Sequence, residues 1–220
     1  MNFTNQKGLA IVLNIADIII DNREYLSEID GAIGDGDHGI NMAKGFSIAK
    51  EEILKEDVNM SQAFKIVADV LMNKIGGSMG PLYGSFFRGL AFKSKNIEDI
   101  DKLVIMSMLE KAYSNIKMIS EAKVNDKTLI DVLDPSILAY KESIEKGSSL
   151  VEALQALMLA ADIGLESTKN MVAKIGRASR LGPRSVGHQD AGATSCNLIL
   201  KTFASSIVYL LKEENDAKNN

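Results

Sequence analysis

Three aspartates, four glycines and a histidine lie within ten residues, from Asp30 to Gly39. The acids are Asp30, Asp35 and Asp37, and His38 is one of two histidines in the chain. Carboxylate oxygens with no neighbouring thiolate are hard ligands, which suit Mg²⁺ or Ca²⁺ rather than zinc. Glycine lets the backbone approach a ligand closely, and a helix that begins near His38 would direct its unpaired N–H groups towards the loop. The pattern predicts a divalent metal that carries phosphates.

Helix capping is the alternative interpretation of these acids. Asp30 could cap a turn, and Asp35 or Asp37 could be the N-cap of the next helix. Three acids among four glycines favour metal binding over this alternative. The spacing lacks the terminal Glu of an EF-hand, so it does not support a calcium-sensor loop. Two interpretations of His38 remain open. It could hydrogen-bond a phosphate or take part in proton transfer, or it could form a local hydrogen bond to a backbone carbonyl.

Two further segments carry donors that suit phosphate. Gly76–Gly80 offers backbone N–H groups and the Ser78 hydroxyl, although no Gly-Lys-Ser/Thr follows as in a Walker A motif. The segment 176–192 contains four glycines, and its polar side chains include Arg177, Arg180, Arg184, His188 and Asp190. A guanidinium there would neutralise phosphate charge. Each signal is weak alone, because glycine runs are often plain turns. Whether Lys127 and Thr128, just before a predicted helix, belong to the site is ambiguous.

Length and composition indicate one ordinary domain. We expect residues 1–220 to form it, with 213–220 as a frayed tail. The net charge of −4, without a basic stripe, argues against a nucleic-acid partner. The single cysteine, Cys196, excludes an internal disulfide and fits a reducing compartment. The apolar run Leu9–Ile20 is interrupted by polar residues and is too short to cross a membrane. We therefore expect a cytoplasmic protein with no membrane partner.

The elements that position these residues are predicted to be helices. Prolines number only three, and good helix formers are abundant. Apolar residues at helical spacing predict eight helices, over about 4–27, 38–55, 61–74, 81–93, 97–122, 128–146, 149–173 and 191–212. Ser61 and Ser149 are the expected N-caps of two of them, Ser149 together with Glu152 in a capping box. Pro135 must lie near a first turn or produce a kink.

Helix direction predicts where the unusual loops meet. Helices joined by short loops alternate in direction, so every second loop lies at the same end. The loop after Asp30 is the first connection, Gly76–Gly80 the third, Lys123–Lys127 the fifth and Gly176–Gly192 the seventh. The sequence therefore predicts an all-α barrel or bundle of eight antiparallel up-and-down helices, with these four loops at one end.

Taken together, these segments resemble the L subunits of dihydroxyacetone kinases, which are the nucleotide-binding subunits. The matching segments cover the chain nearly end to end, in the family's order, at residues 28–42, 76–84, 126–131, 176–182 and 187–194. The resemblance implies a barrel of eight antiparallel helices with the nucleotide at one end. That fold agrees with the arrangement that loop order predicts.

The resemblance also implies roles for individual residues. Asp30, Asp35 and Asp37 would hold two Mg²⁺ ions that bridge the phosphates of ADP or ATP, and they would act through the metal. The implied nucleotide contacts are His38, Gly39, Ile40, Asn41, Ser78, Met79, Ser120, Leu129, Arg177, Asp190, Ala191 and Gly192. Among these, Leu129 would lie against the adenine with Ser120 nearby. The positions that depart from the family's usual residues are Met79 for serine, Ser120 for glycine, Leu129 for methionine and Ala191 for proline.

The implied activity is phosphoryl transfer in glycerol metabolism. A separate K subunit would hold dihydroxyacetone, and this subunit would supply the phosphoryl group. In the phosphotransferase-system version, ADP stays bound and a phosphohistidine carrier, the M subunit, recharges it. The lack of a substrate domain in these 220 residues favours that version. The alternatives are an ATP-exchanging subunit for another small ketose, such as a tetrulose, and a nucleotide-sensing module that transfers nothing. A homodimer is left open.

Overall fold

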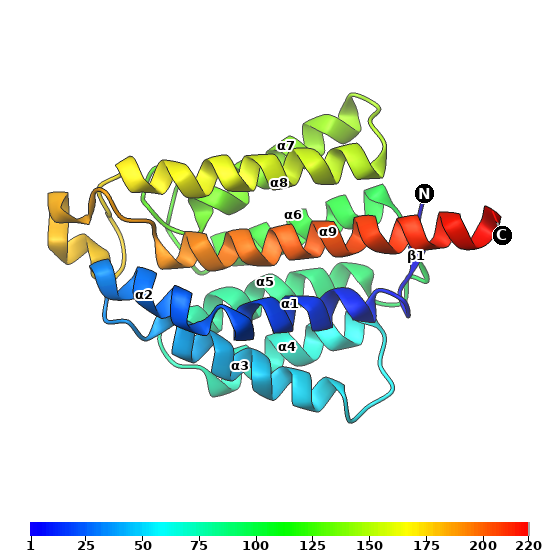
Figure 1. The fold of residues 1–220 in the computed structure, drawn as a ribbon, viewed down its shortest axis with the longest axis horizontal. Helices are drawn as coiled ribbons and strands as arrows, with labels where there is room; N and C mark the ends of the chain where they lie inside the picture. Colours follow the sequence, from blue (N-terminus) through cyan, green and yellow to red (C-terminus); the bar gives the residue numbers. More distant parts are fainter. Residues whose placement is uncertain (220) are drawn as a thin grey trace.

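The computed structural model describes the backbone of residues 1–219, and helices dominate that range (Figure 1). The α-helices are α1 Leu9–Asp21, α2 Arg23–Ile33, α3 His38–Ile53, α4 Met60–Lys74, α5 Met79–Ser94, α6 Lys102–Lys117, α7 Ile130–Glu145, α8 Leu150–Ser167 and α9 Ala191–Asn219. Two 3₁₀ helices, η1 Thr168–Asn170 and η2 Arg177–Ser185, precede α9. Strands β1 Phe3–Thr4 and β2 Asp99–Ile100 form a short antiparallel pair. The predicted all-α class is confirmed.

Residues 1–219 contain nine α-helices rather than eight, because the predicted first helix breaks at Asn22. The Asn22 side chain donates a hydrogen bond to the Ile18 carbonyl at 2.8 Å and so closes the end of α1. Helix α2 then continues in the same general direction (Figure 1). The extra helix therefore adds no reversal, and the alternation of the following helices holds. Helix α2 ends at Ile33, later than predicted, and includes Asp30.

Several predicted helix ends move for local reasons. Helix α4 is capped by Asn59, which forms a capping box with Gln62, rather than by Ser61. Helix α6 begins after β2, where Asp101 accepts hydrogen bonds from two backbone N–H groups. The predicted Ser149 cap and its capping box with Glu152 are confirmed. Pro135 lies inside α7, in its second turn.

The core fills the space between the helices with aliphatic and aromatic side chains. Phe46, Phe64, Phe87 and Phe203 come from α3, α4, α5 and α9. The Phe87 ring centroid lies 5.6 Å from that of Phe46 and 5.8 Å from that of Phe64. Such aromatic pairs add to the burial of apolar area. The Phe203 ring centroid lies 6.4 Å from that of Phe64, so these contacts join four helices around a common interior.

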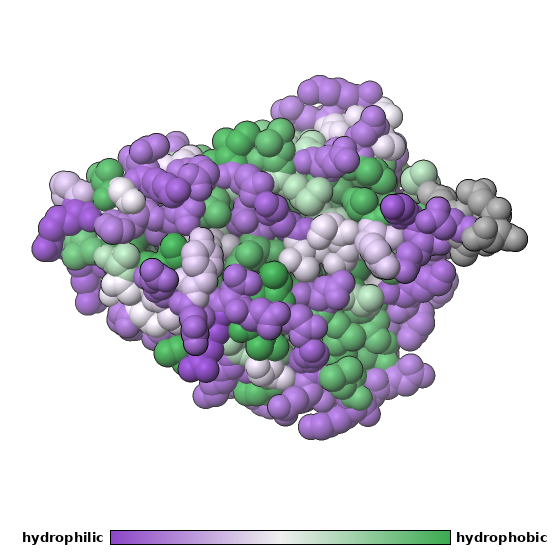
Figure 2. Space-filling view, in the orientation of Figure 1, coloured by the Kyte–Doolittle hydropathy of each residue, from purple (hydrophilic) through white to green (hydrophobic). Residues whose placement is uncertain are grey.

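Helix α9 is the long central element. Among the described residues, its stretch Ala191–Glu214 is long and apolar enough to cross a membrane, yet 61% of that window is buried inside the bundle. Hydrophilic residues also cover much of the face over α1 and α9 (Figure 2). Both features are typical of a core helix. The helix extends through most of the predicted tail, 213–220. Residue 220 lies outside the described part of the chain, and fraying of the tail stays a prediction.

Candidate functional site

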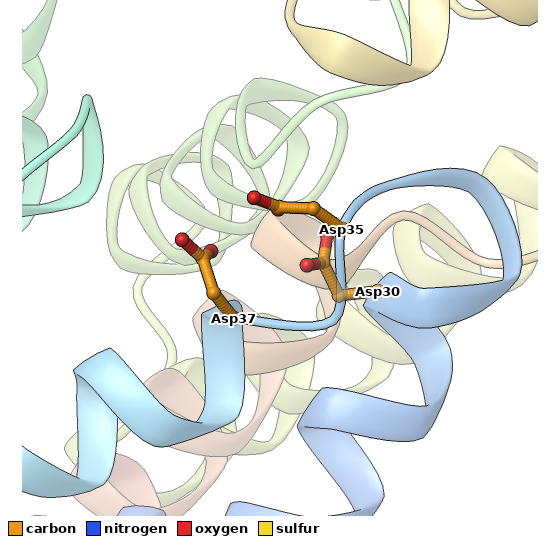
Figure 3. Close-up of side chains that lie close together, drawn as sticks. All are labelled: Asp30, Asp35 and Asp37. Carbon is orange, nitrogen blue, oxygen red and sulfur yellow. The ribbon is translucent and has the colours of Figure 1, made fainter.

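The three predicted carboxylates converge where α2 meets α3 (Figure 3). One oxygen from each of Asp30, Asp35 and Asp37 lies within 4.8 Å of the others. Asp30 belongs to the last turn of α2, and Asp37 occupies the N-cap position of α3. Within the part of the chain that the structure describes, the Asp37 side chain makes no capping hydrogen bond. Capping therefore does not account for the Asp37 carboxylate.

Two glycines shape the loop between these acids. Gly36 has a φ of +77°, in the left-handed region that favours glycine. A Cβ on Gly34 would overlap the Asp30 carboxylate, so only glycine leaves room for that side chain. The backbone N–H of His38 also points to Asp30, with its nitrogen 3.4 Å from Oδ2. The local backbone thus preorganises the three acids.

A cavity of about 780 Å³ opens beside the acids and receives residues from all four predicted loops. This volume is in the range of small-molecule binding sites. The predicted site residues that line it are Asp30, Asp35, Asp37, His38, Asn41, Ser78, Met79, Ser120, Leu129, Arg177, Asp190, Ala191 and Gly192. The prediction that the four loops lie at one end is confirmed. In Figure 1 this end is opposite the chain termini.

Gly39 and Ile40 are not among the residues that line the cavity in the described structure. Ile40 is 47% exposed. A Cβ on Gly39 would overlap the Arg23 carbonyl and lie 2.6 Å from Ser27 Oγ. Gly39 therefore allows α3 to start directly against α2. A nucleotide contact at either residue stays a prediction.

Four helices begin at the cavity, namely α3, α5, α7 and α9. Residues of their first turns line it, including Asn41, Leu82, Ile130 and Gly192. The start of a helix has unpaired N–H groups and a partial positive charge. Four such ends give the cavity an electrostatic preference for a polyanion, while the carboxylates at its edge require a cation.

His38 is buried at the cavity, with 6% of the residue exposed. Its Nε2 lies 2.8 Å from Ser195 Oγ, and that oxygen lies 2.6 Å from the Tyr83 hydroxyl. Burial lowers the pKa of His38 to about 4, against the opposing charge of Asp30. The imidazole is therefore neutral near pH 7, with one ring nitrogen bound to a hydroxyl rather than to a local carbonyl.

The loop before α9 brings a cation and a further acid to the site. Arg177, at the start of η2, forms an ion pair with Asp35. Asp190 accepts a hydrogen bond from the Ala193 N–H at 2.7 Å and so caps α9. Burial raises the pKa of Asp190 to about 7, although that hydrogen bond and the charge of Lys127 lower it. Arg177 therefore contacts the acidic loop between α2 and α3, and Asp190 is near enough to Asp30 for that charge to contribute to its raised pKa.

Other cavity residues escaped the sequence prediction. Tyr83 lines the cavity from α5, and its place in the glycine-rich segment 76–84 was an available signal. Ile116 and Ala122 add apolar surface to the same cavity as Leu129, but their pattern is that of any core position. Lys127, which the sequence left ambiguous, also reaches the cavity.

The residues present fit a divalent cation with a nucleotide. The clustered donors are carboxylate oxygens, the ligand type that Mg²⁺ prefers. Phosphate donors and an apolar wall line the same cavity. The arrangement can therefore hold a metal, a phosphate chain and an aromatic base side by side.

Comparisons with known proteins agree with this geometry. The DAK2 domain family matches residues 32–205. The ADP-binding subunit DhaL of PEP-dependent dihydroxyacetone kinase 1 from Listeria innocua is 34% identical over 209 residues, which cover 94% of this chain and all of that protein. The L-erythrulose kinase of Pectobacterium atrosepticum is also 34% identical, over 90% of this chain but only 34% of its own length.

A solved structure supports the fold. The dihydroxyacetone kinase of C. freundii, in complex with AMP-PNP and Mg²⁺, superposes with a TM-score of 0.68 at 22% identity. The match covers 94% of this chain and 35% of that one. With the family match over most of the chain and a relative aligned along its full length, this chain belongs to the DAK2 domain family, which includes the DhaL subunits of dihydroxyacetone kinases.

Proposed function

We propose that this chain is the ADP-binding phosphotransferase subunit of a dihydroxyacetone kinase. The observation that carries the proposal is the cluster of Asp30, Asp35 and Asp37 at a cavity where four helices begin. Phosphoryl transfer depends mainly on positioning and charge neutralisation. Carboxylates that hold metal and helix ends that bind phosphate supply both.

Each group of residues has a part in this function. Asp30, Asp35 and Asp37 would hold two Mg²⁺ ions, which when bound neutralise phosphate charge and orient the phosphates. Ser78 and the N–H groups at the helix starts would bind phosphate oxygens, and Arg177 would add positive charge. Leu129, a residue that is 6% exposed, would support the base with its apolar side chain.

The acceptor and the donor would come from separate proteins. Dihydroxyacetone would be held by a K subunit, and a phosphohistidine carrier, the M subunit, would recharge ADP in the cytoplasm. The full-length match to a subunit of a PEP-dependent dihydroxyacetone kinase supports this version. ADP would then act as a cofactor and remain bound between turnovers.

Nucleotide content tests the cofactor role. Protein purified without added nucleotide is denatured, and the released nucleotide is quantified by chromatography. ADP in about equimolar amount is expected, because a cofactor that is not exchanged stays with its protein. An empty site would contradict the cofactor role, and an empty site that also fails to bind added Mg-ADP would contradict nucleotide binding itself.

Transfer tests the roles of the acids. Asp35→Asn and Asp37→Asn should abolish phosphate flux to dihydroxyacetone in the presence of K and M subunits. Asp57→Asn is the matched control, since Asp57 is exposed in the connection between α3 and α4, and it should retain the flux. Flux in the first two variants would refute the metal-ligand assignment. Nucleotide binding without flux in the unmodified protein would identify a sensing module.

Another small ketose is the second candidate acceptor. The similarity to an L-erythrulose kinase favours a ketose of that kind as the acceptor. In this version ATP would be the donor and would exchange. Supplying ATP and erythrulose in place of the M subunit and dihydroxyacetone separates the two. Faster transfer under those conditions would reassign the acceptor and the donor.

A further inference from the structure

We propose that Lys127 is a positioning residue that ties down both ends of the loop carrying Arg177. We call residues 172–184 the cap; its residues Ile175, Gly176, Arg177 and Ala178 line the cavity. The role of Lys127 in nucleotide binding rests on the proposed function, in which Arg177 is the residue of the cap that would bind phosphate. The attachment itself rests on contacts of Lys127.

The Lys127 ammonium is enclosed by backbone carbonyls. The residue is 1% exposed, and its Nζ lies within hydrogen-bond distance of four carbonyl oxygens, those of Thr168 (2.8 Å), Met171 (3.3 Å), Ser185 (2.7 Å) and His188 (2.6 Å). Two of these residues precede the cap and two follow it. One ammonium thus joins the segments at which the cap leaves and rejoins the bundle.

Other bonds close the base of the cap around this ammonium. The Ala173 N–H donates to Ser185 Oγ at 2.9 Å, and the Gly187 N–H donates to the Lys169 carbonyl at 2.7 Å. The Lys174 N–H donates to the Asp126 carbonyl at 3.1 Å. The cap is therefore a loop with a closed base, and its tip reaches Asp35 through Arg177.

Backbone geometry indicates that the ammonium is required at this position. Lys127 has a φ of +62°, a left-handed conformation that is unfavourable for a residue with a side chain and that glycine adopts freely. Burying an ammonium adds a further cost unless it is fully hydrogen-bonded. A residue that served only the turn would not need that side chain. The side chain is explained by the hydrogen bonds that its ammonium donates to the four carbonyls.

The anchor lies next to the predicted base contact, so Lys127 links two parts of the site. Asp131 accepts hydrogen bonds from the N–H groups of Asn125 (2.5 Å) and Thr128 (2.7 Å) and so fixes the turn around Lys127 to α7. Leu129 follows two residues after the lysine. Through Lys127, the start of α7 and the cap with Arg177 keep a fixed separation across the cavity.

Hydrogen exchange of the nucleotide-free full chain tests the attachment. Lys127→Met should accelerate exchange in peptides that cover 172–187 by about tenfold or more, while peptides from α4 and α5 stay protected. Lys174→Met is the matched control, because Lys174 belongs to the cap but its Nζ forms an exposed ion pair with Asp126 at 3.2 Å. It should change cap exchange by less than about twofold. Unchanged cap exchange in Lys127→Met would overturn the proposal.

Mg-ADP affinity tests the functional consequence. Lys127→Met should raise the Kd by about tenfold in the wild-type background, as expected when charge-assisted hydrogen bonds are lost. In an Arg177→Ala background it should have less than about a twofold effect, because Lys127 acts through Arg177. Equal effects in both backgrounds would show a general structural role and overturn the positioning assignment.

A further variant and a separate readout keep the test decisive. If Lys127→Met does not fold, Ser185→Ala opens the cap base by removing the acceptor of the Ala173 N–H while the buried charge keeps its carbonyls. It should show the same pattern of cap exchange and the same dependence on Arg177; the absence of both would overturn the proposal. If the wild-type protein does not bind Mg-ADP, the proposed function fails, whereas the exchange result still decides the attachment.

Discussion

His38 Nε2 lies 2.8 Å from Ser195 Oγ, and this contact joins the first residue of α3 to the second turn of α9. Tyr83 of α5 approaches the same oxygen at 2.6 Å and also donates to the Gly192 carbonyl at 2.9 Å. Three helices that begin at the cavity are therefore locked together at their starts. Buried polar groups of this kind specify one arrangement because each needs the others as partners.

Ser195→Ala should lower the free energy of unfolding by about 1–3 kcal/mol, because it removes the hydroxyl partner of the buried His38 Nε2 and one of the two partners of the Tyr83 hydroxyl. Urea denaturation of the nucleotide-free protein measures this change. Ser205→Ala on the same helix is the control, since Ser205 is exposed and its hydroxyl, within the described part of the chain, bonds only to the Thr202 carbonyl, at 3.3 Å. It should cost less than about 0.5 kcal/mol. Equal losses would show that the bonds to Ser195 contribute no stability.

Asp190→Asn should change how stability depends on pH. The folded protein raises the pKa of Asp190 from 3.8 to about 7, so it binds that proton more tightly than the unfolded chain does. The resulting stabilisation is complete below about pH 4 and is lost as the pH rises through about 7. Asparagine should remove a decline of up to about 4 kcal/mol between these limits.

Urea denaturation from pH 4.5 to 8, with a chelator present, measures the effect of Asp190→Asn. Asp57→Asn, at an exposed acid that is not among the residues lining the cavity in the described structure, is the control and should keep the wild-type dependence on pH. A profile for Asp190→Asn that is parallel to the wild-type profile would contradict the prediction.

Gly164→Ala should destabilise the packing of α8 on α7 by about 1–3 kcal/mol. A Cβ there would overlap the Asp131 carbonyl and lie 3.0 Å from Val132 Cα. Gly31→Ala is the control, because the nearest atom to a Cβ at Gly31 is Gly36 Cα at 3.9 Å and alanine favours the helix. Thermal unfolding should show a lower Tm for the first variant only. A retained Tm in Gly164→Ala would mean that the helices separate at little cost.

Mg²⁺ without nucleotide should raise the Tm of the protein by a few degrees, because ligands that bind only the folded state stabilise it. Asp37→Asn should abolish that shift. In chelator the same variant should be at least as stable as the wild type, because it removes repulsion among three clustered carboxylates without losing a capping bond in the described structure. Thermal scans with Mg²⁺ and with chelator measure both effects. A full Mg²⁺ shift in Asp37→Asn would place the ion elsewhere.

Sequence reasoning was strongest where chemistry is local. Asp30, Asp35 and Asp37 with their glycines predicted an acidic cluster, because residues a few positions apart can meet only in a few ways. The apolar spacing predicted helices, and alternation of direction brought Ser78 and Arg177 to the same cavity as those acids. The break at Asn22 was missed, since the amphipathic pattern continues through it. The pairing of Phe3 with Ile100 was also missed, because neither segment is long enough to show strand alternation.

The sequence by itself determined the fold class, the end of the bundle that carries the site and the residue types that meet there. Only the tertiary structure decided that His38 is buried against Ser195 and that Lys127 binds carbonyls 41 to 61 residues away. The physical reason is that periodicity encodes which face of a helix is buried but not which residue lies opposite. Partners of that kind follow from how the helices pack around one core, and a buried histidine and a buried lysine acquire their roles only there.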